Sequence, residues 1–166
     1  MRKRPSKEEY YLNIAEEVAR RGTCLRRLFG AVIVQNDQII STGYVGAPRG
    51  TINCNELGEC PRQKAGIPPG ERYELCRSVH AEMNAIIHAS RQEMLGSAIY
   101  LACVNPETGE RMGGTRPCKL CTRMIINAGI ARVIVGESDG QFTVYYVEDW
   151  VKEDKAEWNL EKLSGY

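Results

Sequence analysis

The chain has 166 residues, enough for a single domain with a buried core, and its 22 basic and 21 acidic residues give a formal net charge of +1. Proteins that grip long nucleic acid usually carry a strong basic excess, so this balance fits a small substrate better. No segment approaches the roughly 20 apolar residues that span a bilayer, and the basic N-terminus is not followed by the apolar run of a signal peptide, so we expect a soluble, cytoplasmic protein.

The first predicted element is an amphipathic helix over about residues 7–21. Ser6 and Glu9 have the spacing of a capping box, and Gly22 ends the periodic pattern. The inner face is predicted from apolar residues at helical spacing: Tyr10, Ile14 and Val18, with Tyr11 beside them.

A β-hairpin is predicted next. Residues 30–34 are a continuous apolar run typical of a strand buried on both faces, Asn36-Asp37 supplies a turn, and residues 38–44 return as the second strand. Residues 45–78 show no sustained period and contain cysteines, glycines and prolines. A loop this long in a compact domain usually has a function or is fixed in place by other interactions.

The next predicted helix begins near Val79 and has Arg91 in its last turn. Its inner face is predicted to consist of Met83, Ile86, Ile87 and Ser90. Residues 98–104 form the third strand, and the turn at 105–110 lets residues 110–113 pair back as a short arm.

A further helix opens at Cys118 and ends with glycine at Asn127-Ala128-Gly129. Its apolar residues are Met124, Ile125 and Ile126. Residues 130–136 and 141–147 are the fourth and fifth strands, and a charged helical tail covers about 148–164. The tail would dock through Trp150, Val151, Trp158 and Leu160. This alternation predicts an α/β fold, a three-layer α/β/α sandwich with a mixed sheet of about five strands.

Two short stretches carry the chemistry: His80-Ala81-Glu82 and Pro117-Cys118-Lys119-Leu120-Cys121. His80, Cys118 and Cys121 offer one imidazole and two thiols, a set that leaves the fourth position of a catalytic zinc open to water. His-x-Glu followed by Pro-Cys-x-x-Cys is the signature of zinc-dependent nucleobase deaminases. Each half alone is weak evidence, because CxxC is common and a histidine at a helix start is more often a cap or core residue.

The spacing within each stretch fits one shared site. Residues two apart diverge in mid-helix, so His80 and Glu82 converge only in a first turn. Cys118 and Cys121 lie on one face of a first turn, where the helix dipole favours the metal-binding thiolate. Zinc-bound hydroxide would attack the ring carbon that bears an exocyclic amine, C4 of cytosine, with Glu82 as the proton shuttle.

Four further cysteines lie before the first strand or in the long loop: Cys24, Cys54, Cys60 and Cys76. Four thiolates would form a second, closed, structural zinc site that holds the loop. Separate buried thiols or a partial site are the alternatives, and Cys76, four residues before His80, could belong to the catalytic site instead. Cys103, inside a predicted strand, is interpreted as a core residue.

These residues resemble the deoxycytidylate deaminases, within the cytidine deaminase-like superfamily. The resemblance covers about residues 7–137, and its most specific piece is residues 80–86, His-Ala-Glu-Met-Asn-Ala-Ile. The other matching pieces are Cys24 and residues 30–34, 41–50, 53–54, 117–121 and 127–130.

The resemblance implies a five-stranded mixed sheet between helix layers and zinc-dependent conversion of dCMP to dUMP and ammonia. Some members bind a second zinc near the first strand and the loop. Many members are hexamers regulated by dCTP and dTTP, and a triphosphate effector could bring Mg²⁺. Gly43, Gly46 and Arg91 resemble parts of that effector site.

Two departures from the family pattern bear on the substrate. The family has an asparagine after Tyr44 that contacts substrate in related deaminases, whereas this chain has Val45, which cannot make that hydrogen bond. Residues 105–116 are an insertion expected to project beside the metal. Neither change touches the zinc ligands. The prediction that the chain catalyses a deamination is therefore better supported than the prediction that its substrate is dCMP.

Candidates for binding a 5′-phosphate are Arg26, Arg27 and Arg116, although each is equally an ordinary solvated arginine. Tyr44 and Val45 are the candidate substrate contacts, and Tyr145 and Tyr146 could supply a stacking ring. The alternatives to a dCMP deaminase are a deaminase of another base or of a modified nucleotide, and a non-catalytic nucleotide-binding regulatory protein that retains the fold. The intact Glu82 argues against the regulatory protein.

Overall fold

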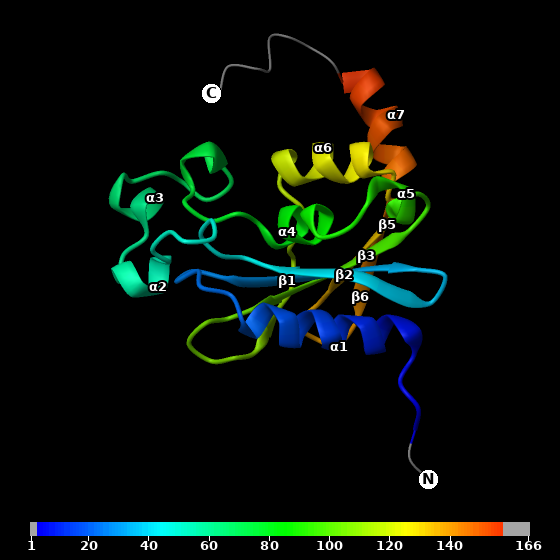
Figure 1. Ribbon diagram of the computed structural model, residues 1–166, viewed down its shortest axis with the longest axis horizontal. Coiled ribbons are helices and arrows are strands. Elements are labelled where there is room, and N and C mark those ends of the chain that lie inside the picture. The colour runs from blue at the N-terminus through cyan, green and yellow to red at the C-terminus, as the bar shows by residue number, and fades with distance from the viewer. Residues whose placement is uncertain (1–2, 158–166) are drawn as a thin grey trace.

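A mixed sheet forms the middle layer of the computed structural model, which describes residues 3–157 (Figure 1). The elements, in chain order, are α1 (Lys7–Arg20), β1 (Leu28–Gln35), β2 (Gln38–Tyr44), α2 (Cys54–Leu57), α3 (Pro61–Lys64), the 3₁₀ turn η1 (Tyr73–Leu75), α4 (Ala81–Ile87), α5 (Arg91–Met94), β3 (Ala98–Val104), β4 (Arg111–Met112), α6 (Lys119–Ala128), β5 (Arg132–Gly136), β6 (Phe142–Tyr146) and α7 (Val147–Glu157).

The strand order β2-β1-β3-β5-β6 confirms the predicted mixed sheet, and β4 is a sixth strand that pairs only with the end of β3. β3 and β5 are parallel, whereas the other neighbours are antiparallel. The hairpin turn has Asn36 and Asp37 at φ 48° and 64°, the left-handed conformation that a tight two-residue hairpin requires.

Helices cover both faces of the sheet, as the predicted sandwich requires. Figure 1 shows α1 on one face and α4, α6 and α7 on the other. Ser6 caps α1 by accepting a hydrogen bond from the Glu9 backbone N–H at 3.1 Å. The predicted inner face of α1 is partly wrong, because Tyr10 is exposed. The residues that α1 buries are Tyr11, Leu12, Ala15 and Ala19.

The helix predicted to run from residue 79 to Arg91 is two helices. α4 ends at Ile87, which is 66% exposed, and Ser90 caps a new helix in a capping box with Glu93. Arg91 is therefore the first residue of α5. Sequence reading missed the break because Ser90 and Glu93 also fit a continuing helix.

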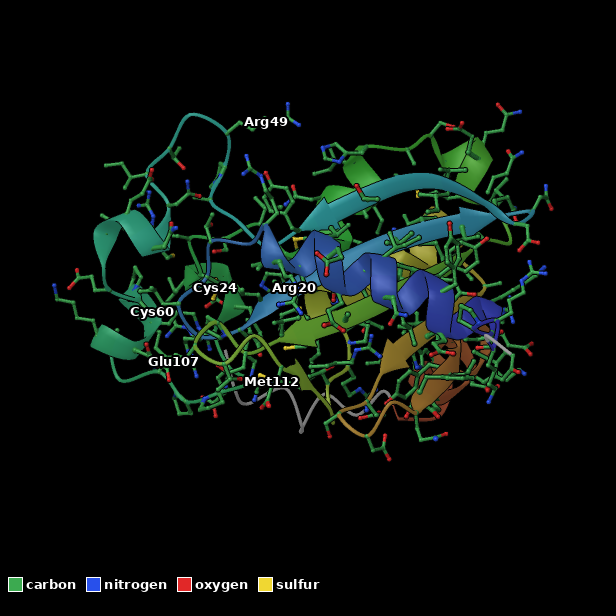
Figure 2. All side chains as sticks on the ribbon, turned by 90° about the horizontal axis from the view of Figure 1, so that it is seen from below. Arg20, Cys24, Arg49, Cys60, Glu107 and Met112 are labelled. Atoms are coloured by element: carbon green, nitrogen blue, oxygen red, sulfur yellow. The ribbon has the colours of Figure 1, made fainter. Side chains whose placement is uncertain are left out.

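The insertion forms a β-hairpin arm, which contains the Glu107 and Met112 side chains labelled in Figure 2. The predicted pairing of the arm with the third strand is confirmed. Arg111 donates to the carboxylate of Glu16 at 2.8 Å and to Asn13 at 2.9 Å, both on α1. These bonds attach the arm to α1, which lies on the face opposite α4 and α6, and the expectation that the insertion projects beside the metal stays a prediction.

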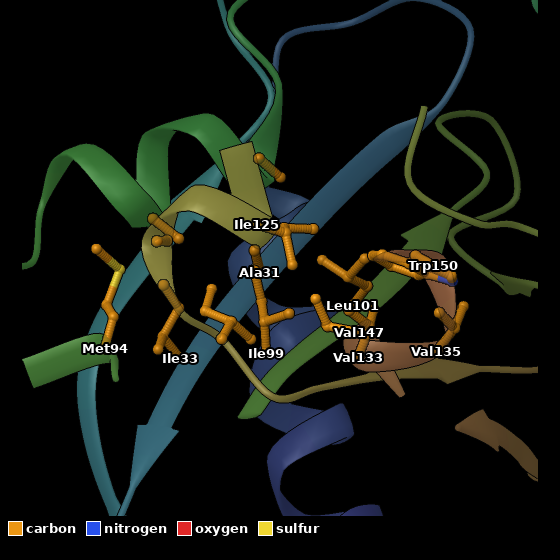
Figure 3. Packing of buried hydrophobic residues seen from close by; sticks show 14 residues of the cluster. Ala31, Ile33, Met94, Ile99, Leu101, Ile125, Val133, Val135, Val147 and Trp150 are labelled. Atoms are coloured by element: carbon orange, nitrogen blue, oxygen red, sulfur yellow. The ribbon is translucent and has the colours of Figure 1, made fainter. Parts of the chain in front are cut away.

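The larger core lies between the sheet and the helices α4, α6 and α7. Figure 3 shows Ile125 of α6 and Trp150 of α7 packed with strand residues such as Leu101 and Val133. The docking of the tail through Trp150 is confirmed, whereas Trp158 and Leu160 lie outside the described residues. No helix of the described part is long and apolar enough to cross a membrane.

Candidate active site

Helix α4 is held against the edge strand β2 by unusually close packing. A Cβ on Gly43 would lie 2.3 Å from the backbone nitrogen of Ala85, so only glycine permits this approach. Ser41 donates to the carbonyl of Ala85 at 2.8 Å, and the amide of Asn84 donates to the carbonyl of Tyr44 at 2.8 Å. These contacts fix the helix whose first turn carries His80 and Glu82.

Two helix N-termini present the predicted metal ligands. His80 is the N-cap of α4, and Cys118 is the N-cap of α6, with Cys121 in the first turn. Both caps have extended backbone, with φ and ψ of −70° and 157° at His80 and −69° and 167° at Cys118. The side chains at the caps therefore project beyond the helix ends, where the dipoles favour thiolates.

The ligand atoms of His80, Cys118 and Cys121 lie within 4.8 Å of one another. Nδ1 of His80 is 3.4 Å from the sulfur of Cys118 and 3.4 Å from the sulfur of Cys121. Zinc–sulfur and zinc–nitrogen bonds of about 2.3 and 2.0 Å in a tetrahedron require nitrogen–sulfur separations of about 3.5 Å. The three side chains therefore fit one zinc ion, and in the described part of the chain no other group of His, Cys, Asp or Glu has this spacing.

The protonation of the three side chains is coupled. The sulfur of Cys118 accepts hydrogen bonds from Cys121 and His80, which lower the pKa of Cys118 to about 4 despite its burial. The same bond raises the pKa of Cys121. Burial lowers the pKa of His80, but the hydrogen bonds to Cys118 and Cys76 outweigh this and raise it to about 10. Zinc must displace the protons held by this cluster.

Glu82 lies in the first turn of α4 and is only 5% exposed. Burial raises the pKa of its carboxyl group, although the neighbouring His80 opposes this. Glu82 is not part of the ligand cluster. A buried carboxyl beside a metal site, free of ligation, is suited to carry protons.

Four further cysteines, besides Cys103 in β3, are free thiols of the α1–β1 connection and the excursion 45–79. Figure 2 shows Cys24 and Cys60 at the α2 and α3 end of the molecule. The sulfur of Cys24 accepts from the Arg26 backbone N–H at 3.5 Å. Burial raises the pKa of Cys54, and the thiols of Cys24, Cys76 and Cys60 are near enough to raise it further.

Cys76 differs from these thiols because its pKa is lowered, first by a hydrogen bond to His80. Cys76 therefore interacts both with His80 of the candidate metal site and with Cys54 of the long loop.

The predicted substrate residues are dispersed. Val45 is 5% exposed, and its backbone bonds to Phe29 and Thr23, so its side chain is part of the core. Tyr44 is 38% exposed. Arg26 is half-buried and Arg27 is exposed. The exposed Arg116 lies with its guanidinium carbon 5.7 Å from the ring centre of Tyr145.

The predicted effector residues do not share one place. Gly43 packs against α4, and Arg91 donates to the carbonyl of Asn127 at 2.9 Å. Gly46 lines an open pocket of about 480 Å³ beside the C-terminus of α1. The polar residues around it include Arg20, Arg21, Arg49, Thr51, Asn53 and Asn55. Sequence reading singled out Gly46 but not these arginines, because Arg20 and Arg21 are distant in the chain from Arg49.

Residues 5–137 match the model of the cytidine and deoxycytidylate deaminase zinc-binding region. The chain is 38% identical over 131 residues to a deoxycytidylate deaminase of Schizosaccharomyces pombe, covering 79% of this chain but 37% of that protein. It is 35% identical over 136 residues to that of Mycobacterium phage D29, covering 79% of this chain and 94% of the phage protein. The chain thus spans about a third of one relative and nearly all of the other.

Solved structures agree. The dCMP deaminase of cyanophage S-TIM5 in complex with dCMP and dUMP aligns with a TM-score of 0.58 at 27% identity, covering 84% of this chain and 90% of that one. A cytidine deaminase from Burkholderia pseudomallei aligns with a TM-score of 0.53 at 17% identity, covering 83% and 91%, which supports the fold alone.

Proposed function

This chain belongs to the cytidine and deoxycytidylate deaminase family, and we propose that it is a zinc-dependent enzyme that converts dCMP to dUMP and ammonia. The observation that carries the proposal is the approach of His80 Nδ1 to within 3.4 Å of both cysteine sulfurs, beside a buried, non-ligating Glu82. This arrangement provides three ligands and a separate proton carrier.

His80, Cys118 and Cys121 would hold the metal, which when bound supplies the Lewis acidity that makes water nucleophilic at neutral pH. Glu82 removes a proton from the attacking water and delivers it to N3 of the cytosine ring. With the C4–O bond formed, Glu82 takes the remaining proton of the C4 hydroxyl and passes it to the amino group, so that the C4–N bond breaks, ammonia leaves and C4=O remains. The raised pKa of Glu82 suits both directions of transfer.

The substrate assignment rests on relatives. The phage and fission-yeast proteins are named deoxycytidylate deaminases, and the cyanophage structure holds dCMP and dUMP. One observation favours deamination of another base or of a modified nucleotide: Val45 is buried and cannot supply the expected amide. We propose Tyr44 and the cations Arg26, Arg27 and Arg116 as the residues to test for contact with the nucleotide.

The deciding experiment is ammonia release from dCMP, compared with other cytosine, adenine and guanine nucleotides, nucleosides and bases. Zinc-loaded protein should release ammonia from dCMP, and Glu82→Gln should release it at least about 100-fold more slowly while it retains zinc. Absence of turnover on every compound by zinc-loaded protein would overturn the proposal and favour a regulatory nucleotide-binding protein.

We also propose a second, structural zinc held by Cys24, Cys54, Cys60 and Cys76. Support comes from the thiols of Cys24, Cys60 and Cys76, which are near enough to Cys54 to raise its pKa. The backbone N–H of Arg26, which donates to the sulfur of Cys24, would also stabilise a thiolate there. Metal analysis should give two zinc ions per chain, and Cys54→Ser should reduce this to one. A content of one zinc in both proteins would contradict the second site.

The open pocket with Gly46 is our proposed site for a dCTP or dTTP effector, with or without Mg²⁺, because three arginines suit a triphosphate. Gly43 and Arg91 then have structural roles, Gly43 by packing against α4 and Arg91 by its hydrogen bond to Asn127. Arg49→Ala should weaken dCTP binding at least tenfold, measured by calorimetry, whereas Arg91→Ala should not. Equal binding by the Arg49 variant would exclude this pocket.

We also propose a homo-oligomer, a hexamer by the resemblance to deoxycytidylate deaminases. Ile52 and Ile87 are large apolar side chains that are 56% and 66% exposed, and their burial in an assembly would remove apolar surface from water. Light scattering coupled to gel filtration measures the subunit number directly, and a monomer at all concentrations would contradict the proposal.

A further inference from the structure

Arg62 in α3 is a buried charge that the proposed reaction does not use. Its side chain is 5% exposed, although most of the surrounding excursion is exposed. Nη2 donates to the carbonyl of Pro68 at 3.1 Å and to that of Glu71. Nε is buried and has no hydrogen-bond partner within the described part of the chain. Incomplete pairing of a buried guanidinium is unfavourable, so this arginine does more than fill space.

The guanidinium of Arg62 also covers one face of the Tyr73 ring, with its central carbon 4.5 Å from the ring centre. A planar guanidinium stacks on an aromatic face in a way that a lysine ammonium cannot. Through the carbonyls of Pro68 and Glu71, the same side chain fixes the segment that leads to Tyr73. Tyr73 lies in a 3₁₀ turn of three residues, which by itself gives the ring little support. Arg62 thus determines where the Tyr73 ring lies.

Tyr73 in turn contacts the metal-binding imidazole. The rings of Tyr73 and His80 meet edge to face, with centres 5.4 Å apart and planes at 88°. Nδ1 of His80 points at the two cysteine sulfurs, so the plane of this ring sets the direction of the bond to the metal. Groups that hold a ligating histidine commonly change metal affinity or activity by about 10- to 100-fold when removed.

We infer that Arg62 and Tyr73 are positioning residues for the catalytic metal: Arg62 holds Tyr73, and Tyr73 holds the imidazole of His80 in the plane that binds the ion. The excursion between α2 and α4 then serves the active site as well as the fold. The inference deepens the proposed function, on which it depends for the identity of the ligands.

The test uses full-length protein loaded with ¹¹³Cd²⁺ in place of zinc, because ¹¹³Cd NMR separates a site with two sulfurs from a site with four. Arg62→Met keeps the apolar stem and removes the planar cation, and Tyr73→Leu removes the ring. Both should shift or broaden the two-sulfur resonance. Tyr73→Phe keeps the ring and should leave the resonance unchanged. Arg77→Met should also leave it unchanged, since Arg77 is an exposed arginine of the same excursion that donates to the carbonyl of Ile52.

Zinc-loaded Arg62→Met and Tyr73→Leu should also lose kcat by about 10- to 100-fold with KM changed less than about threefold, and Arg62→Lys should not restore the rate. An unmoved two-sulfur resonance in folded Tyr73→Leu would overturn the inference, even if Arg62→Met failed to fold. Wild-type protein that deaminates nothing would refute the proposed function, while the cadmium resonances would still decide the positioning role.

Discussion

At the scale of single residues, Glu82 is buried but is not one of the proposed metal ligands. Its carboxyl is 5% exposed and has a raised pKa because burial disfavours its charged form. Replacing it with glutamine keeps the size and removes the proton. We expect Glu82→Gln to lower kcat by about 10² to 10⁴-fold, since general acid–base catalysis contributes that much.

Steady-state ammonia release measures this loss, and zinc content by mass spectrometry is the control. Because Glu82 is not a ligand, the variant should hold as much zinc as the wild type. Full activity in a zinc-loaded variant would show that another group moves the protons.

Cys103 and Cys118 should differ in reactivity, because their environments shift their pKa values in opposite directions. Burial raises the pKa of Cys103 to about 11, and hydrogen bonds lower that of Cys118 to about 4. At pH 7 about one Cys103 in 10⁴ is a thiolate, whereas metal-free Cys118 is ionised.

Timed alkylation followed by peptide mass spectrometry should label Cys118 early in chelator-treated protein and Cys103 last. Zinc should protect Cys118. Raising the pH toward 11 should speed labelling of Cys103, since its thiolate forms there. Equal alkylation rates for Cys103 and Cys118 at pH 7 in metal-free protein would contradict the opposite shifts of their pKa values.

At the scale of elements, the site depends on how closely α4 approaches β2. A Cβ on Gly43 would lie 2.3 Å from the nitrogen of Ala85 and 2.4 Å from the carbonyl oxygen of Ala81. Backbone cannot yield as a flexible side chain can, so we expect Gly43→Ala to destabilise the fold by about 1–3 kcal/mol. Urea unfolding gives this value, and Gln38→Ala, at the exposed start of the same strand, should change stability by less than about 0.5 kcal/mol.

Sequence reading predicted correctly the elements that are specified by neighbouring residues. It was wrong where one local pattern fits two structures and tertiary packing decides between them. The hairpin, the buried third strand and the glycine that ends α6 all follow from local preferences. The division of the 79–91 helix did not, because Ser90 begins a helix as readily as it continues one. The inner face of α1 was misjudged for a similar reason: α1 passes close to β1 where Ala15 and Ala19 lie against Gly30, and this close approach is a matter of packing.

At the scale of the whole molecule, the metal joins helices that are nearly 40 residues apart in the chain. Binding to the folded state alone stabilises it by about 4 kcal/mol when free zinc is 1,000-fold above its dissociation constant. We therefore expect chelator-treated protein to melt at a lower temperature and Zn²⁺ to restore the melting temperature.

The control for this prediction is Cys121→Ser, which removes one of the three proposed ligands of the catalytic site. Its melting temperature should respond less to added zinc than that of the wild type. An identical response would mean that the stabilising zinc is bound elsewhere.

The sequence alone determined the chemistry of the metal site, because it depends on spacing along the chain: His-x-Glu can converge only at a helix start, and Cys-x-x-Cys places both thiols on one helix face. Only the tertiary structure decided which distant groups meet. The pairing of Arg62, Tyr73 and His80, the pocket of arginines beside α1 and the placement of the insertion arm against α1 depend on three-dimensional packing. No local pattern encodes them, because contacts between distant residues arise from packing the whole chain.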